Sequence, residues 1–327
     1  MYNQVHNQIE AVLEQYEVEI NDITKGRGTH ICHTDKSIWT LTGFRGTKEK
    51  GELLRTYLEA LKEAGFMAEQ IAVNKMGEAV SVDEVTGEKF LLKEYITGTE
   101  LNVNQAKELN EAAGLLAQYH NTASALTIAG IPVDVECDTM IIQEKEKHER
   151  ELIKVKNYIR NRKKKNEFER IYLNAYEPML KTARESLLLL HKKREAQPGC
   201  CFCHGDYNQH NVLWTNQGWR IVNFENMIYR WCIWDLANFI RKMQEKNNWD
   251  VGIGNEILKC YEKIRPLSEV EFEKLYALLL FPEKFWKVTN HYMNSRKSWI
   301  SERDIEKLRK VIEQEESRIH FVEQLNN

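Results

Sequence analysis

Short apolar runs separated by turn-forming residues fill the first part of the chain, from about Val18 to Ile96. Glycine, aspartate and serine gather between these runs, and such clusters are typical of tight turns between strands. The turns are expected at 25–28 (KGRG), 34–37 (TDKS) and 85–88 (VTGE). This pattern predicts an antiparallel sheet.

One helix is expected to interrupt the sheet. Thr47 suits the cap at a helix start, and Gly65 is typical of the position just beyond a helix end. Between them, apolar residues recur at the spacing of a single helix face. These residues are Leu53, Leu54, Tyr57, Leu58 and Leu61.

The period of the apolar residues becomes helical after Gly98. Leu109, Ala113, Leu116 and His120 are separated by four, three and four positions, so they share one helix face. Beyond them, charge-rich helices are expected over 140–194, strand and loop character near Cys201, and helices again from Trp234 onward. A second apolar stripe comprises Phe168, Tyr172, Ala175, Met179 and Ala183.

Two regions with different periods predict an α+β protein with two lobes. Residues 1–96 are expected to form a small sheet lobe, and residues 97–327 a larger, mainly helical lobe. The chain is long enough to bury a substantial core in either arrangement.

Composition and charge exclude several partners. Of the 327 residues, 42% are hydrophobic and 29% charged, and the net charge of -3 provides no attraction for nucleic acid. The basic run at 160–165 is interpreted as a solvated helix face. Apolar runs fall short of the roughly 18 residues that a membrane span needs, and the first residues do not resemble a signal peptide. We therefore expect synthesis in the cytoplasm and no membrane partner.

Seven cysteines, an odd number, predict reduced thiols in a chain of this size. Cys200, Cys201 and Cys203 stand directly before His204 and offer metal-ligand chemistry. Zinc sites usually combine two such knuckles, and no second knuckle follows in the sequence. Buried strand thiols are the favoured interpretation.

The segment 203–213 (CHGDYNQHNVL) carries the candidate chemistry. Its H-x-D-x-x-x-x-N spacing provides a carboxylate, Asp206, that can accept the proton of an attacking hydroxyl, and an amide, Asn211, that can hold a metal ion against phosphates. The next strand, in 219–225 (WRIVNFE), is expected to deliver a second metal carboxylate twelve residues beyond Asn211. That position is Asn223.

With these residues in this order, the chain resembles the aminoglycoside-phosphotransferase and choline-kinase superfamily, which has a protein-kinase-like fold. Within it, the chain resembles the CotS family of spore coat proteins most. The resemblance is carried by 234–237 (WDLA), 248–250 (NWD), 261–268 (YEKIRPLS) and the aromatic-rich run 281–299. It covers nearly the whole chain and is strongest from Cys203 onward.

The resemblance implies a location and a set of partners. A CotS-like protein is made in the mother cell and then joins the spore coat, so other coat proteins are expected partners. The fold implies ATP and Mg2+, with an adenine-binding hinge placed at Glu94, Tyr95 and Ile96. It also implies that Asp235 hydrogen-bonds the backbone of the catalytic loop, although a helix N-cap is an equal alternative for that residue.

Two departures from the family weaken the expected ATP and Mg2+ site. Asn223 removes a negative charge from the metal position. Thr42 stands at the end of a strand where the family places a phosphate-contacting lysine. Glu225, two residues beyond Asn223 and on the same face if the strand continues, is a candidate replacement metal ligand. Lys93 and Lys75 are candidate lysines that the sequence does not place.

For several other side chains we favour a structural role over a catalytic or ligand-binding one. The glycines at 26 and 28 are interpreted as a hairpin turn rather than a phosphate loop, and His204 as a buried hydrogen-bonding residue. His120 is expected in the core, and the aromatic residues Trp286, Tyr292 and Trp299 in the core or a cleft wall. His210 is left unassigned.

Two functions follow from these observations. The first is a spore coat protein with a degenerate or weakly active kinase fold that acts in coat assembly. The second is an ATP-dependent kinase that phosphorylates a hydroxyl of a small molecule or sugar, with Asp206 as the base. Asn223 and Thr42 favour the first. Antibiotic resistance is least favoured, because the chain shows no recognisable aminoglycoside pocket.

Overall fold

The computed structural model describes residues 2–126, 137–192, 197–294 and 301–325. The chain divides into two compact units, each assembled from separate stretches of sequence. The first unit comprises Met1–Leu101, Asn121–Ile131 and His204–Ile228, and the second comprises Asn102–His120, Pro132–Cys203 and Tyr229–Asn327. The first unit contains two antiparallel sheets and the second is mainly helical, which confirms the α+β prediction. The single boundary at 96/97 stays a prediction.

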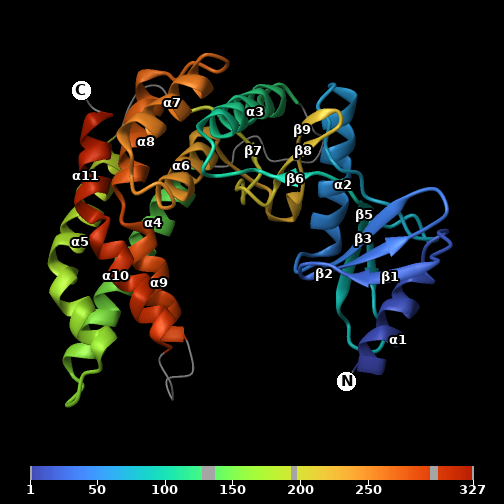
Figure 1. The fold of residues 1–327 in the computed structure, drawn as a ribbon, viewed down its shortest axis with the longest axis horizontal. Helices are drawn as coiled ribbons and strands as arrows, with labels where there is room; N and C mark the ends of the chain where they lie inside the picture. Colours follow the sequence, from blue (N-terminus) through green and yellow to red (C-terminus); the bar gives the residue numbers. More distant parts are fainter. Residues whose placement is uncertain (1, 127–136, 193–196, 295–300, 326–327) are drawn as a thin grey trace. The chain divides into compact units, whose positions relative to one another are not determined.

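A five-stranded antiparallel sheet forms much of the first unit, with strand order β1-β2-β3-β5-β4 (Figure 1). The predicted turns at 25–28, 34–37 and 85–88 connect consecutive strands of this sheet. The strands are β1 Asp22–Lys25, β2 Thr29–His33, β3 Ile38–Gly43, β4 Val80–Val82 and β5 Lys89–Glu94.

The predicted helix α2 (Lys48–Glu63) interrupts the sheet as expected. The side chain of Thr47 accepts a hydrogen bond from the backbone N–H of Lys50, which confirms the predicted cap. Gly65 follows the helix with a φ of +83°, a left-handed conformation that glycine adopts without strain.

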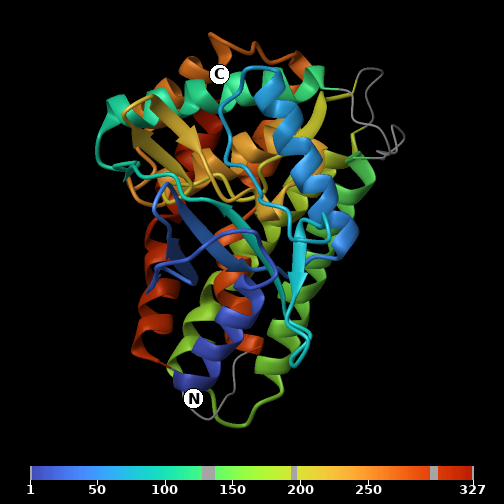
Figure 2. The same cartoon turned by 90° about the vertical axis from the view of Figure 1, so that its right-hand side faces the viewer.

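A second helix, α1 (Tyr2–Leu13), precedes the sheet and was not expected from the sequence. It lies against the sheet of the first unit (Figures 1 and 2). Its buried residues join apolar side chains of β2, β3 and β5 in one core, whose members are Ile9, Val12, Leu13, Tyr16, Cys32, Leu41, Phe90 and Leu92. The helix thus covers apolar strand residues that would otherwise face water.

A smaller sheet completes the first unit, with strand order β6-β8-β9. Its strands are β6 Thr99–Glu100, β8 Val212–Thr215 and β9 Gly218–Ile221, and the 3-10 helix η1 (Phe224–Asn226) follows them. An isolated parallel bridge joins Ala68 to Ile221. The segment after α2 therefore lies beside the end of β9, within the same unit.

Helices α3 to α11 and the paired strands β7 and β10 form the second unit, apart from short ends of α3 and β10. None of its described helices, nor of those in the first unit, has the length and apolarity to cross a membrane. The bounds are α3 Ala106–Ala125, α4 Cys137–Arg160, α5 Glu167–His191, β7 Cys200–Cys203, β10 Ile228–Trp231, α6 Cys232–Gln244, α7 Val251–Glu262, α8 Glu269–Leu280, α9 Glu283–Asn294, α10 Glu302–Glu313 and α11 Glu315–Gln324.

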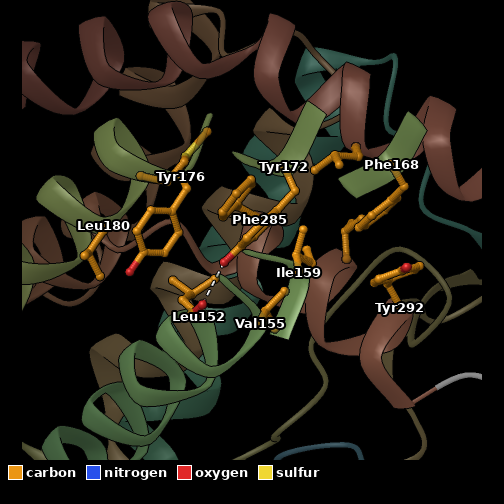
Figure 3. Close-up of a cluster of buried hydrophobic side chains, with 12 residues drawn as sticks. Leu152, Val155, Ile159, Phe168, Tyr172, Tyr176, Leu180, Phe285 and Tyr292 are labelled. Atoms are coloured by element: carbon orange, nitrogen blue, oxygen red, sulfur yellow. Dashed lines mark hydrogen bonds between the residues drawn. The ribbon is translucent and has the colours of Figure 1, made fainter. Parts of the chain in front are cut away.

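Aliphatic side chains of α4 and aromatic side chains of α5 and α9 form much of the core shown in Figure 3. Tyr172 stacks on Phe285 with ring centroids 5.3 Å apart, and its hydroxyl donates a hydrogen bond to the carbonyl of Leu152 at 2.7 Å. Tyr292 stacks on Phe168 with a centroid separation of 4.2 Å. The predicted apolar stripe of α5 therefore faces the interior, and Tyr292 is a core residue.

Several plainer interpretations are confirmed in this unit. His120 is buried and shares a 2.7 Å hydrogen bond with the Tyr261 hydroxyl. Trp286 stacks on His148, and its indole N–H donates to Glu151. Trp299 lies outside the described residues. The basic run at 160–165 is solvated, but only its first residue is helical, so the helix-face interpretation is wrong.

The seven cysteines are free thiols, as predicted. Cys201 and Cys203 are buried on β7, and their sulfurs and a ring nitrogen of His120 lie within 4.8 Å of one another. Burial raises the pKa of Cys203 to about 12, and its sulfur lies 3.2 Å from the carbonyl oxygen of Trp231, as a thiol donor would. These contacts support the interpretation as buried strand thiols.

Candidate active site

The loop between β7 and β8 folds tightly around a glycine. Gly205 has a φ of +83°, and a Cβ atom at this position would lie 2.0 Å from the carbonyl oxygen of Asn226. Only glycine fits such a close approach of two backbone segments. The loop is thereby held against η1, which directly follows Asn223, the expected second metal position.

His204 anchors the same loop from its buried start. Its Nε2 lies 2.9 Å from the carbonyl oxygen of Val222, and the backbone N–H of Asp206 donates to its Nδ1 at 3.1 Å. This pattern requires a neutral imidazole with the proton on Nε2. His204 is a positioning residue, as the sequence indicated, because both ring nitrogens are engaged by the backbone.

Asp206 and Asn211 lie together in the loop. The side-chain amide of Asn211 donates to the backbone carbonyl of Asp206 at 2.9 Å and lies 3.4 Å from its carboxylate oxygen. Asn208 donates to the same carbonyl at 2.9 Å. Asp206 is half-buried and lines the cleft described below, so a ligand can reach its carboxylate.

Asn223 does not lie on a strand, so the reasoning that placed Asn223 and Glu225 on one strand face is wrong. Strand β9 ends at Ile221, and Asn223 adopts the left-handed conformation with φ 67° and ψ 58° before η1. Asparagine tolerates this conformation better than most residues. The turn nevertheless places the side chains of Asn223 and Glu225 around one common atom, the ammonium nitrogen of Lys93.

Lys93 is the lysine that the sequence could not place. It extends from β5, is 3% exposed, and donates to Oδ1 of Asn223 at 2.6 Å and to Oε1 of Glu225. Its ammonium also lies 3.3 Å from a carboxylate oxygen of Glu69. Burial alone would lower the pKa of Lys93, but the two carboxylates outweigh burial and raise it. Lys75, the other candidate, donates to the Glu14 carbonyl.

Glu69 is a site residue that the sequence gave no reason to select. Its side chain is 3% exposed, and its Oε1 accepts the backbone N–H groups of Asn223 at 2.7 Å and Phe224 at 3.1 Å. Burial raises the pKa of the Glu69 carboxyl, and the ammonium of Lys93 opposes that shift. Glu69 therefore fixes the turn that carries Asn223 and also balances the charge of Lys93.

The register of the sheet explains why a lysine on β5, rather than one on β3, brings the positive charge to the cleft. Lys93 on β5 pairs directly with Thr40 on β3, and Thr42 pairs with Leu91. Directly paired residues of antiparallel strands project from the same face. The positive charge therefore lies one strand away from its expected strand, and on the face of the sheet that lines the cleft.

The glycine turn between β1 and β2 is a hairpin, as favoured. The backbone N–H of Gly26 donates to the carbonyl of Thr29 at 2.9 Å, and Gly28 has a φ of +72°. The turn also borders the cleft, where a guanidinium nitrogen of Arg27 lies 3.0 Å from Nδ1 of His210. That same nitrogen of His210 lies 2.6 Å from a carboxylate oxygen of Glu100.

A cleft of about 490 Å³, within the usual range for small-molecule sites, brings these parts together in the first unit. The predicted hinge residues Glu94, Tyr95 and Ile96 line it together with Asp206, Asn211 and Asn223. At the hinge, the backbone N–H of Glu94 donates to Gln70 at 2.8 Å. The roles expected for these residues, including Glu225 as a metal ligand, stay predictions.

Asp235 lies in the second unit, within the first turn of α6. The N-cap of that helix is Trp231, so the N-cap alternative for Asp235 is wrong. Its carboxylate is 1% exposed and lies 3.6 Å from Nε2 of His120. The hydrogen bond to the loop backbone, which the family resemblance implies, stays a prediction.

A small antiparallel sheet, a mainly helical part and a His-x-Asp loop of this kind define the aminoglycoside-phosphotransferase and choline-kinase class of kinase-like folds. An aminoglycoside phosphotransferase from Alicyclobacillus acidocaldarius has a TM-score of 0.80 at 18% identity, over 97% of this chain and 95% of that one. Choline kinase LicA from Streptococcus pneumoniae has a TM-score of 0.53 at 16% identity, over 95% and 98%. At these identities the likeness establishes the fold.

Within that class, the chain belongs to the family described as "Spore coat putative kinase YutH", whose model matches residues 9–325. Spore coat protein S of Bacillus subtilis is 30% identical over 93 residues, which are 28% of this chain and 26% of that protein. Hydroxylysine kinase of Danio rerio is 30% identical over 86 residues, or 24% of each chain. The chain therefore matches about a quarter of the length of these curated relatives. The resemblance to CotS-type coat proteins is confirmed.

Proposed function

We propose that this protein is a component of the spore coat, and that its kinase-like cleft binds a nucleotide without transferring phosphate. Membership of the spore coat kinase family supports the location. An amicoumacin kinase solved with AMP-PNP and Ca2+ has the same fold, with a TM-score of 0.61 at 14% identity over 98% of this chain and 96% of that one. Its bound nucleotide analogue is the reason for proposing that this cleft binds a nucleotide. Synthesis in the mother cell and assembly with other coat proteins complete the proposal.

One observation is the main support for the proposal that no phosphate is transferred. The side-chain N–H of Asn223 donates to the side-chain oxygen of Asn211 at 2.8 Å. An aspartate at position 223 would have no N–H to donate, and the oxygen of Asn211 would stay open to a cation. The two residues expected to hold magnesium are instead hydrogen-bonded to each other.

The donor set does not fit a resident magnesium ion for a second reason. Mg2+ requires nearly octahedral oxygen ligands close to it and is usually held by one or two carboxylates. Here Asn211 and Asn223 are neutral, and the Glu225 carboxylate accepts a hydrogen bond from the Lys93 ammonium. Nucleotide recognition would therefore depend on the hinge at Glu94–Ile96 and on the cleft walls.

The direct test of this function is turnover of the γ-phosphate. We expect purified protein with ATP and Mg2+ to release no phosphate above the rate of an Asp206→Asn variant, because that variant removes the carboxylate proposed as the base. Turnover at least tenfold above that of the variant would contradict the proposal. It would favour the second function below.

The coat location has its own test. A fluorescent fusion of the full chain, produced during sporulation in a Bacillus species, is expected to form a ring around the developing spore. A fusion that stays distributed through the mother-cell cytoplasm would contradict a coat role. This outcome is independent of whether the cleft binds a nucleotide.

Replacing Asn223 with aspartate should restore part of the metal response. The substitution removes the N–H that donates to the side-chain oxygen of Asn211, and it adds a carboxylate to the site. With magnesium-ATP at about 100 times its dissociation constant, a ligand adds roughly 2.7 kcal/mol of stability, or several degrees in Tm. We expect a magnesium-dependent rise in Tm for Asn223→Asp and none for the native chain. An equal rise in both proteins would contradict the role of Asn223.

A second function is favoured by one specific observation. The buried pair of Lys93 and Glu69, with Nζ and Oε2 3.3 Å apart, provides a lysine and a carboxylate beside the loop that holds Asp206. A working kinase needs a lysine near the phosphates. In that case Asp206 would act as the base toward a hydroxyl of a small molecule or sugar. The turnover measurement above separates the two functions.

A further inference from the structure

Lys93 has no hydrogen left to donate to a ligand. An ammonium group carries three N–H donors. Those of Lys93 point to Asn223, to Glu225 and to Glu69, at 2.6 Å for Asn223 and 3.3–3.4 Å for Glu69. The side chains of Lys93 and Glu69 are each 3% exposed, and that of Glu225 is 19% exposed. The ammonium is therefore surrounded by side-chain oxygen atoms of the protein itself.

The atoms around this ammonium are those that a divalent cation would need. Oδ1 of Asn223 and Oε1 of Glu225 are the metal-ligand oxygens expected from the sequence, and both accept a hydrogen bond from Lys93. A metal ion bound to these oxygens would lie only a few ångströms from the ammonium. Two cations at that separation repel strongly in a buried site. In the native chain, where Asn223 is neutral and adds no negative charge, Lys93 and a divalent metal therefore exclude each other.

From this arrangement we infer that Lys93 is a tethered cation that takes the place of the divalent metal, and that the cleft binds its ligand without one. The inference deepens the proposed function and rests on its nucleotide-binding cleft. It also changes the role of the lysine. A phosphate-contacting lysine needs a free N–H, whereas this ammonium neutralises the protein's own carboxylates.

Charges along the cleft indicate which ligands it accepts. Its lining includes two cationic side chains, Arg27 and Lys93, and four acidic ones. The acidic residues are Glu69, Glu94, Glu100 and Asp206. A triphosphate without a metal ion would face this negative excess. The cleft should therefore favour a nucleoside or a nucleoside monophosphate over a nucleoside triphosphate.

Binding of Mn2+, followed by electron paramagnetic resonance without nucleotide, tests the tethered cation. Removing the ammonium in Lys93→Met leaves Glu69 and Glu225 without a counter-charge, so the variant should bind Mn2+ at least tenfold more tightly than the native chain. Lys75→Met is the matched control, because the Lys75 ammonium donates to the Glu14 carbonyl at 2.7 Å and Lys75 does not line the cleft. It should bind Mn2+ as the native chain does.

Two further variants keep the test decisive. Lys93→Gln removes the charge but retains two N–H donors, and it replaces Lys93→Met if that variant does not fold. Adding Glu225→Gln to either variant should abolish the gain, which locates the ion. If neither variant binds Mn2+ more tightly than Lys75→Met, or if the gain survives Glu225→Gln, the inference is wrong. The absence of phosphate turnover, measured separately, would still stand in that case.

Discussion

Replacing Glu69 with leucine is expected to lower the free energy of unfolding by about 3–5 kcal/mol, the usual cost of leaving a buried charge without its partner. Lys93 would lose one of its two carboxylates in a site where it is 3% exposed. The N–H groups of Asn223 and Phe224 would lose the oxygen that now accepts both. Urea denaturation of the native chain and the variant measures the difference.

An exposed lysine–glutamate pair of the same unit provides the matched control. Lys48 and Glu78 form an ion pair of 2.7 Å, with side chains 47% and 37% exposed. Pairs of this kind contribute at most about 1 kcal/mol, so Glu78→Leu should change stability little. Adding Lys93→Met to Glu69→Leu should recover part of the loss, because the buried ammonium is then gone. Equal losses in Glu69→Leu and Glu78→Leu would contradict the account of the buried pair.

Alanine at position 205 is expected to destabilise the protein by about 3 kcal/mol or more. The left-handed conformation alone costs a non-glycine residue roughly 1–2 kcal/mol. At Gly205 a Cβ would in addition meet the Asn226 carbonyl oxygen at 2.0 Å and its carbon at 2.7 Å. Because both contacts are with backbone, the loop or η1 must move, and overpacking of this kind costs a further 1–3 kcal/mol or so.

Gly87 separates the two contributions. It has a φ of +72°, and a Cβ placed there has nothing within 4 Å. Gly87→Ala should therefore show the conformational cost alone, about 1–2 kcal/mol. The two variants are compared by urea denaturation under identical conditions. A loss at position 205 no larger than at position 87 would show that the loop and η1 do not approach each other as closely as described.

Local signals in the sequence were sufficient for much of the fold. Some features depend only on residues near each other in the chain, so the sequence predicts them. They include the turns of the larger sheet, the Thr47 cap and the helical stripe at Phe168. Helix α1 was not predicted because its apolar residues, including Ile9 and Val12, pack against strands that are distant in the sequence. Their spacing alone did not distinguish the segment from a polar terminus.

The candidate site was predicted in part for the same reason. Asp206, Asn211 and Asn223 follow a local spacing, and the structure brings them together. The role of Lys93 depends on its register opposite Thr40, which no local pattern specifies. Glu69 lies in an irregular segment without a motif, and its function is visible only in its contacts with Asn223 and Phe224.

Glu225 lies beside Asn223 as expected, but not for the geometric reason expected. Its placement beside Asn223 was expected from a strand in which alternate side chains share a face. The chain instead turns at Asn223 into η1, with a φ of 67°. The turn directs both side chains to the same ammonium, so their proximity has a different geometric cause.

Nucleotide binding with and without a divalent metal tests the central claim most directly. Calorimetric titration of AMP and of ATP into the native chain would be carried out in EDTA and again in excess Mg2+. The account predicts that the Kd for AMP is the same in both buffers and that ATP binds no more tightly than AMP. A Kd for ATP at least tenfold lower in Mg2+ than in EDTA would contradict it, because the metal would then occupy the place assigned to Lys93.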